Sequence, residues 1–287
     1  MEGKFIGCES SFDDADIVLF GVRFDATSTY RRGSAQAPLA VRRESYGIET
    51  YSPYLDADLA DYKIHDAGDI AFIDGRANAG TMDDLESMLQ QTHEKTWGII
   101  SAGKFPMMLG GEHLVTLGAF RAIAQKHKDV CIIHFDAHTD LREDWEGNPY
   151  NHSTVIRRCY DLVGKDRIFQ FGIRSGEKHE FEWAQENTFL VKNNFEGLSN
   201  ALKIIGDRPI YFTIDVDVLD PSEMPGTGTP EAGGVRFLEL LSACKEVFQI
   251  GNVVGCDITE HSPMHDTNGA STALVCKLLR EILLLTK

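Results

Sequence analysis

Short apolar runs that alternate with amphipathic segments constrain the fold of this 287-residue chain more than any other feature. The runs are rich in β-branched and aromatic residues and are apolar at successive positions, which is typical of strands buried on both faces. Strands of this kind in alternation with helices predict a parallel α/β sheet covered on both sides. The predicted strands are Ile17–Val22, Pro106–Leu109, Val130–Phe135, Arg167–Ile173, Ile210–Ile214 and Asn252–Ile258.

Segments with helical periodicity separate these runs. The earliest is expected to open at a capping box, Thr81-Met82-Asp83-Asp84, and to run toward Lys104. No repeat, low-complexity tract or Pro/Ser-rich linker divides the chain, so we expect a single domain over residues 1–287. The other predicted helices are Leu114–Lys126, Thr154–Val163, Lys178–Glu186, Val235–Phe248 and Ala270–Leu285.

Potential metal ligands follow the third predicted strand. Asp136, His138 and Asp140 stand at alternate positions, and an extended backbone directs such side chains to one side. Burying two carboxylates this close together is costly without a counter-charge, so the group calls for a cation. Taken alone, the triplet is also compatible with a solvated acidic loop.

The same pattern recurs after two other strands. Asp215 and Asp217 follow Ile210–Ile214, and His113 follows two glycines that permit a tight turn. Ligands in parallel sheets bind at the carboxyl ends of the strands, where these side chains would meet. Two imidazoles and four carboxylates without a thiolate suit a divalent ion such as Mn²⁺. Six ligands fit two ions that share carboxylates and activate a bridging water as hydroxide.

Two further positions extend the candidate site. His152 lies at the end of a polar loop, where it could pass a proton to a leaving amine, although a solvated histidine fits the same context. Glu260 follows the last predicted strand, where it could hold a cationic group bidentately or serve as a cap or surface residue. His134, inside a strand, is expected to be a satisfied core histidine, and His265 is compatible with a place at the rim.

The charge balance limits the partners of the chain. Its 28 basic and 44 acidic side chains give a net charge of −16, which argues against nucleic acids and anionic membrane surfaces. A cationic substrate or metal ions fit this surplus, and so does solubility alone. The N-terminus lacks an apolar core, no long apolar run follows, and six scattered cysteines form no CxxC pair. These features predict a cytoplasmic protein without a disulfide framework.

Five segments of the chain resemble motifs of the ureohydrolase family, which includes the arginases and agmatinases. The resemblance runs from about residue 16 to residue 285. It implies a three-layer α/β/α domain with an eight-stranded parallel sheet, two Mn²⁺ ions per chain, and assembly as a homotrimer or homohexamer. The segments that carry it are Gly110–His113, Asp136–Asp140, Asp215–Pro221, Pro225–Gly234 and Asp257–Glu260.

The resemblance also implies a role for each candidate residue. Asp136 and Asp215 would bridge the two ions, and a hydroxide between the ions would attack the guanidinium carbon of the substrate. Asp140 would accept a hydrogen bond from that hydroxide, Glu260 would bind the guanidinium, and His152 would help to protonate the departing amine. One ion would be held by His113, Asp136, Asp140 and Asp215, and the other by Asp136, His138, Asp215 and Asp217.

The loop after Asp140 bears on the substrate. Arginases usually carry an Asn two residues past this ligand, where the present chain has Arg142. The loop most resembles that of bacterial agmatinases, which implies hydrolysis of agmatine to putrescine and urea. The acidic Glu143, Asp144 and Glu146 would then lie near the far ammonium of agmatine. An inward-pointing Arg142 would instead favour a substrate with a carboxylate.

Other interpretations stay open. The chain could be a different amidinohydrolase (a guanidinobutyrase, formiminoglutamase or arginase), and His261 and Ser262 depart from the usual pattern close to the substrate pocket. A non-catalytic relative would be expected to lack at least one of the six ligands, His152 or Glu260, yet all are present. The related deacetylase fold binds a single Zn²⁺, which four carboxylates and two histidines fit less well.

Overall fold

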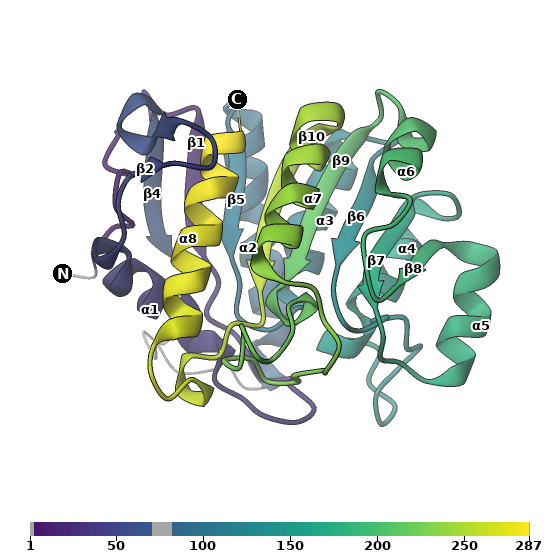
Figure 1. The fold of residues 1–287 in the computed structure, drawn as a ribbon. Helices are drawn as coiled ribbons and strands as arrows, with labels where there is room; N and C mark the ends of the chain where they lie inside the picture. The colour runs from purple at the N-terminus through teal and green to yellow at the C-terminus, as the bar shows by residue number, and fades with distance from the viewer. Residues whose placement is uncertain (1–2, 71–81, 287) are drawn as a thin grey trace.

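The computed structural model describes residues 3–70 and 82–286, and an eight-stranded sheet whose neighbouring strands are all parallel runs through it (Figure 1). A short antiparallel pair, β2 (Tyr51–Ser52) and β3 (Ala57–Asp58), lies outside this sheet. Across the sheet the order is β4 (Ile64–Asp69), β1 (Ile17–Gly21), β5 (Phe105–Leu109), β10 (Asn252–Thr259), β9 (Pro209–Asp215), β6 (Cys131–Phe135), β7 (Ile168–Ile173) and β8 (Phe189–Lys192).

Helices cover both faces of this sheet (Figure 1). The predicted three-layer α/β/α fold with an eight-stranded parallel sheet is therefore confirmed. No helix in the described ranges has both the length and the hydropathy needed to cross a membrane. One layer contains α1 (Ala37–Glu44), α6 (Leu198–Ile205), α7 (Phe237–Ile250) and α8 (Ala270–Leu285); the other contains α2 (Leu85–Ser101), α3 (Val115–Lys126) and α4 (Val155–Val163), and α5 (Lys178–Asn187) lies beside β8.

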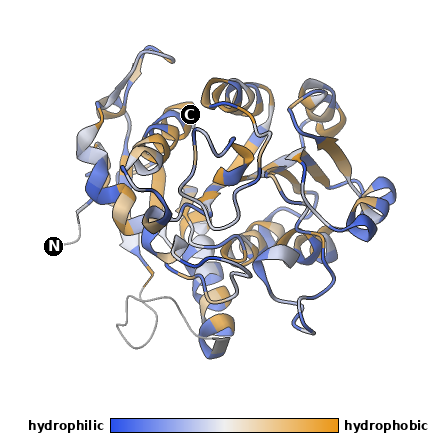
Figure 2. Cartoon of the chain, turned by 60° about the horizontal axis from the view of Figure 1, so that its bottom comes forward, coloured by the Kyte–Doolittle hydropathy of each residue, from blue (hydrophilic) through white to orange (hydrophobic). Residues whose placement is uncertain are grey.

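The central strands bury side chains on both faces, because alternate residues of a strand point in opposite directions. On β6, Cys131 and Ile133 join the core under α6, α7 and α8, whereas Ile132 joins the core under α2, α3 and α4. Figure 2 shows the hydrophobic strands between helices that carry both a hydrophobic and a hydrophilic side. Two-sided burial explains why the strands are apolar at successive positions rather than at every second one.

Both sheet strands that the sequence pattern missed lie at the edges of the sheet. β4 has the polar sequence Ile-His-Asp-Ala-Gly-Asp, and β8 consists of four partly exposed residues. An edge strand has a neighbour on one side only, so it needs less apolar surface than a central strand. The predicted capping box begins at Thr81, which lies outside the described residues, and α2 begins at Leu85. The eight-residue helices α1 and α6 were also not predicted.

The glycines after β5 are required by a close approach of two backbone segments. A Cβ atom on Gly111 would lie 2.0 Å from the backbone oxygen of Phe24. The same oxygen accepts a hydrogen bond from the amide of Glu112 at 2.8 Å. This contact fixes the direction of the chain immediately before His113.

We expect Gly111→Ala to destabilise the fold by about 3 kcal/mol, because the methyl group must displace backbone rather than a flexible side chain. Gly98→Ala is the matched control. Gly98 lies on the exposed side of α2 with no atom within 4 Å of its Cβ position, so alanine should stabilise the helix by about 0.5–1 kcal/mol. Urea unfolding of both variants measures the change in the free energy of unfolding. Equal changes would contradict the steric role given to Gly111.

Candidate metal centre

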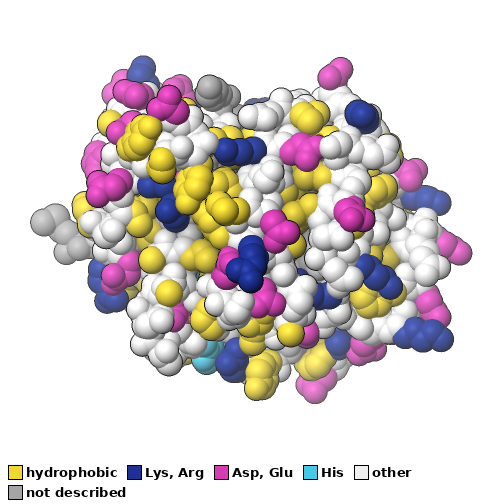
Figure 3. Space-filling view, viewed as in Figure 1, with side chains coloured by type: hydrophobic (Ala, Val, Ile, Leu, Met, Phe, Trp, Pro, Cys, Tyr) yellow, Lys and Arg dark blue, Asp and Glu magenta, His cyan; other side chains and the backbone are white. Residues whose placement is uncertain are grey.

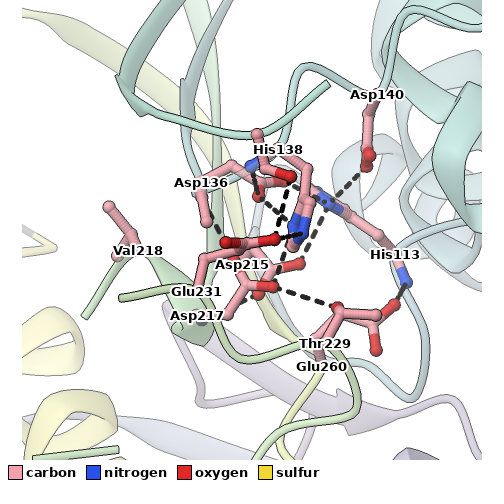
Figure 4. A network of polar contacts seen from close by, with 12 residues as sticks. His113, Asp136, His138, Asp140, Asp215, Asp217, Val218, Thr229, Glu231 and Glu260 are labelled. Atoms are coloured by element: carbon pink, nitrogen blue, oxygen red, sulfur yellow. Dashed lines mark hydrogen bonds and ion pairs between the residues drawn. The ribbon is translucent and has the colours of Figure 1, made fainter. Parts of the chain in front are cut away.

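Four neighbouring strands bring the candidate residues to one edge of the sheet. In the order β5, β10, β9 and β6, the carboxyl ends of these strands lead to His113, Glu260, Asp215 and Asp136. The consecutive strands β5 and β6 are separated in the sheet by β10 and β9. The site therefore lies at a switch in strand order, where parallel α/β sheets bind ligands. Figure 4 shows the side chains converging from these strand ends.

One group of side chains surrounds a single nitrogen of His113. Nδ1 lies 3.1 Å from Oδ2 of Asp136, 3.1 Å from Oδ2 of Asp140 and 3.5 Å from Oδ2 of Asp215. This nitrogen is buried and makes no hydrogen bond. A buried nitrogen without a hydrogen-bond partner, facing three carboxylate oxygens, fits a position for a cation.

A second group lies beside the first and shares Asp136 with it. Nδ1 of His138 is 3.0 Å from Oδ2 of Asp217 and 3.4 Å from Oδ1 of Asp136. The hydroxyl of Thr229 donates to Oδ2 of Asp217 at 3.2 Å. Asp136 thus presents one oxygen to each group, as a carboxylate shared by two cations would. The structure brings all six predicted ligands together, although Asp215 lies at the margin of the tightest groups.

The electrostatics of these groups show a deficit of positive charge. Burial and the nearby carboxylates of Asp217 and Asp136 raise the pKa of Asp215 well above its usual value. Burial alone would lower the pKa of His113, but attraction to Asp136, Asp140 and Asp215 outweighs burial and raises it well above its usual value. Both shifts show that the site favours added positive charge, whether protons or metal ions supply it.

His134 touches this site without offering a free nitrogen to a cation. The side-chain nitrogen of Gln170 donates to the carbonyl of Thr139 at 2.7 Å, which fixes the orientation of the amide. The same nitrogen lies 3.1 Å from Nδ1 of His134, so Nδ1 accepts and the proton resides on Nε2. Nε2 in turn donates to Oδ2 of Asp136 at 2.7 Å. The predicted core histidine is therefore buried and satisfied, but it also orients a predicted ligand.

His152 and Glu260 are in direct contact. Nδ1 of His152 lies 3.0 Å from Oε1 of Glu260, which also accepts from the amide of His113 at 2.8 Å. Asp140 and Glu260 both have positive φ angles, 51° and 64°. Non-glycine residues in this region are strained, and such strain tends to occur at functional sites. The structure thus brings His152 and Glu260, both predicted from the sequence, to the edge of the ligand cluster.

A cavity of about 280 Å³ is lined by His152, by the candidate ligands His138, Asp140 and Asp215, and by residues at the start of α5. The family resemblance led us to expect Glu143, Asp144 and Glu146 near the far ammonium of the substrate. All three are exposed, and none lines the cavity. The acidic residues that do line it beyond the ligand cluster are Glu177 and Glu180, at the start of α5. They were missed because they are far in sequence from the ligand motifs.

Two further residues outside the predicted set shape the loops around the centre. The guanidinium of Arg174 donates to the backbone oxygens of Asp217 at 2.6 Å and of Glu231 at 3.0 Å, which ties the loop after β9 in place. His261 is buried outside the cavity lining, and its Nδ1 donates to the carbonyl of Gly226 at 3.0 Å. This departure from the family pattern therefore supports a loop and does not contact the pocket.

A three-layer α/β/α fold with two acid–imidazole groups at its switch point defines a class of proteins built to bind metal ions at the edge of a parallel sheet. A model of the Arginase family matches residues 15–285. The chain belongs to this family, as its resemblance to ureohydrolases implied.

The chain is similar over nearly its whole length to several agmatinases. It is 45% identical to an agmatinase of Bacillus anthracis over 283 residues, which cover 98% of this chain and 95% of the relative. An agmatinase of Bacillus subtilis is 44% identical over the same shares of the two chains. Among solved structures, the agmatine ureohydrolase of Thermoplasma volcanium superposes with a TM-score of 0.88 at 33% identity, covering 99% of this chain and 94% of that one.

We expect Asp215→Asn to change stability in opposite directions with and without metal. In metal-free protein the variant should be more stable, because it removes a carboxylate that burial and two neighbouring acids disfavour. With Mn²⁺ at about a hundredfold excess over Kd, wild type should gain roughly 3 kcal/mol for each ion bound, and the variant much less. Thermal unfolding with and without Mn²⁺ measures both effects. Asp220→Asn, in the same loop but outside the ligand cluster, is the control and should change stability equally with and without Mn²⁺.

His261 gives a prediction for acid stability. Burial lowers the pKa of His261 to about 4 from its usual 6.5. Below pH 6.5 the unfolded chain takes up a proton that the folded chain refuses, so stability falls as pH drops toward 4, by about 3 kcal/mol in total. His261→Asn removes this titration and should flatten the dependence of unfolding free energy on pH in metal-free protein. An unchanged slope in His261→Asn would contradict the assignment.

Proposed function

We propose that this chain hydrolyses agmatine to putrescine and urea with two Mn²⁺ ions as cofactors. The observation that carries the proposal is the pair of acid–imidazole groups that share Asp136 beside the Glu260–His152 contact. The first feature can hold two cations, and the second offers a carboxylate and a proton donor for a guanidinium group. The similarity to agmatinases at 44–45% identity over nearly the whole chain supports the choice of substrate.

The donor set supports manganese. Carboxylate oxygens and imidazole nitrogens without a thiolate suit Mn²⁺ better than soft metals. When bound, the two ions would lower the pKa of a water molecule so that it can attack the guanidinium carbon. The proposed ligands are His113, Asp136, Asp140 and Asp215 for one ion, and Asp136, His138, Asp215 and Asp217 for the other, with Asp136 and Asp215 shared.

Glu260 and His152 would act on the substrate itself. Hydrolysis joins a water oxygen to the guanidinium carbon and breaks the bond from that carbon to the alkyl nitrogen, so a proton must reach the departing amine. Glu260 would bind the guanidinium through its carboxylate, and Asp140 would accept a hydrogen bond from the attacking water. His152 would donate the proton to the amine.

The surroundings of His152 suit a residue that gains and loses a proton. Burial would lower its pKa, but the hydrogen bond to Glu260 outweighs burial and raises it. Thr29 offers Nε2 of His152 a backbone donor at 3.0 Å and a hydroxyl at 2.9 Å. The amide serves the neutral ring, and the hydroxyl can accept from the protonated ring. Both protonation states therefore have a partner.

Arg142 supports agmatine over a substrate with a carboxylate. It lines the cavity, but its guanidinium is 3.1 Å from Glu177 and 3.7 Å from Glu180. It also lies over the ring of Trp145, 4.7 Å from its centre. Two carboxylates thus offset one positive charge, so this part of the cavity does not favour an anionic substrate end. The alternative of a guanidinobutyrase is correspondingly weaker.

Urea release from agmatine, arginine and 4-guanidinobutyrate, each with added Mn²⁺, tests the proposed function. We expect kcat/KM to be highest for agmatine, because a cationic far end meets net negative charge in the cavity. Faster turnover of either competitor would overturn the choice of substrate. No urea from any of the three, in protein that binds metal, would overturn the proposed activity.

Glu177→Gln should shift this preference. Removing one of the two carboxylates that offset Arg142 should lower kcat/KM for agmatine relative to 4-guanidinobutyrate by about fivefold, the equivalent of about 1 kcal/mol for a partly exposed pair. Glu182→Gln is the matched control, because Glu182 pairs with Lys178 on the same helix and does not line the cavity. An unchanged ratio in Glu177→Gln would contradict the role given to Arg142.

We infer a reducing cytoplasm and a homotrimer or homohexamer from the sequence and its family resemblance. All six cysteines are buried and free of disulfide bonds, which supports the compartment. The proposed oligomers rest on the family resemblance alone.

A further inference from the structure

A buried aspartate, Asp257, lies beneath the candidate metal centre and is surrounded by hydroxyl groups. It is completely buried on β10, two residues before the strand ends. Its Oδ2 accepts hydrogen bonds from Tyr211 at 2.5 Å and from Thr116 at 2.9 Å, and its Oδ1 accepts from Thr213 at 2.6 Å. None of these residues is among the proposed ligands. Because an ionised carboxylate accepts from all three hydroxyls at once, the arrangement suits a buried charge.

Thr213 links this aspartate to His113. The residue lies on β9 opposite Asp257 of β10 in the strand register. Its hydroxyl is 2.8 Å from Nε2 of His113. A hydroxyl has one hydrogen, and the carboxylate can only accept, so the hydrogen of Thr213 goes to Asp257. The remaining lone pairs of Thr213 can then accept a hydrogen bond from Nε2 of His113.

This direction of donation determines which nitrogen of His113 is free. With its proton on Nε2, the neutral ring presents a lone pair on Nδ1. Nδ1 is the nitrogen that faces Asp136 and Asp140 at 3.1 Å and makes no hydrogen bond. Outer groups that fix the tautomer of a metal-binding histidine are common and change metal affinity by about 10–100-fold.

We propose that Thr213 and Asp257 are positioning residues that hold His113 in the tautomer able to bind a metal ion through Nδ1. The inference rests on the proposed metal centre and extends it to a chain of hydrogen bonds that reaches no substrate. It requires the Thr213 hydroxyl itself rather than the volume of the side chain. It also concerns only the ion proposed to bind His113, because the described contacts of His138 do not include Thr213 or Asp257.

The test is Mn²⁺ titration of chelator-treated protein by calorimetry in matched variants. Thr213→Val keeps the shape and removes the hydroxyl, and it should weaken one of two binding events about 10–100-fold. Thr213→Ser keeps the hydroxyl, and both events should stay within about threefold of wild type. Tyr211→Phe removes a different donor to Asp257 and leaves the contact with Thr213, so it should also stay within about threefold. Thr213→Ala repeats the deletion of the hydroxyl should the valine variant not fold.

The outcomes separate this inference from the proposed function. Wild-type affinity at both sites in Thr213→Val would overturn the inference and leave the metal centre intact. Equal weakening in Thr213→Val and Thr213→Ser would also overturn it, because packing rather than the hydroxyl would then matter. Binding of fewer than two ions by wild-type protein would overturn the proposed cofactor together with the inference. Selective loss of one binding event in the variants without the hydroxyl would support it.

Discussion

Mutual repulsion among buried carboxylates is the constraint on which the rest of this structure depends. Asp136, Asp140, Asp215 and Asp217 converge at the ends of two strands, and His113 and His138 lie among them. The folded chain concentrates negative charge here, and burial together with repulsion therefore raises the pKa of Asp215. A pair of divalent ions would neutralise this charge. The surrounding sheet must supply the free energy that holds these groups together until cations bind.

The layers around the site hold the repelling carboxylates in place. Apolar residues on both faces of β6 and β9 anchor the strand ends, and Arg174 ties down the loop that carries Asp217. Buried polar side chains under the site then orient individual ligands, as Gln170 does through His134.

Most of the acidic surplus of the whole chain lies outside the candidate metal centre. Figure 3 shows acidic side chains dispersed over the visible face, as expected for a solvated surface.

Sequence patterns predicted the ligand set because each member lies at the end of a buried strand or within a few residues of it. Asp136 and Asp215 are examples, and a parallel sheet necessarily brings such positions to one edge. The edge strand β4 was missed because its polar sequence lacks the apolar run that marks a central strand. Glu177 and the contacts of Arg142 were missed for another reason. They depend on how α5 packs across the cavity, and no spacing along the chain encodes that packing.

The most direct test of the account is a crystal structure of the Mn²⁺-loaded protein, with anomalous scattering used to locate the metal. The account predicts two manganese peaks on either side of Asp136, one in contact with Nδ1 of His113 and the other with Nδ1 of His138. His134 should contact neither ion. A single peak, or a peak coordinated by His134 in place of His113, would contradict the central claim.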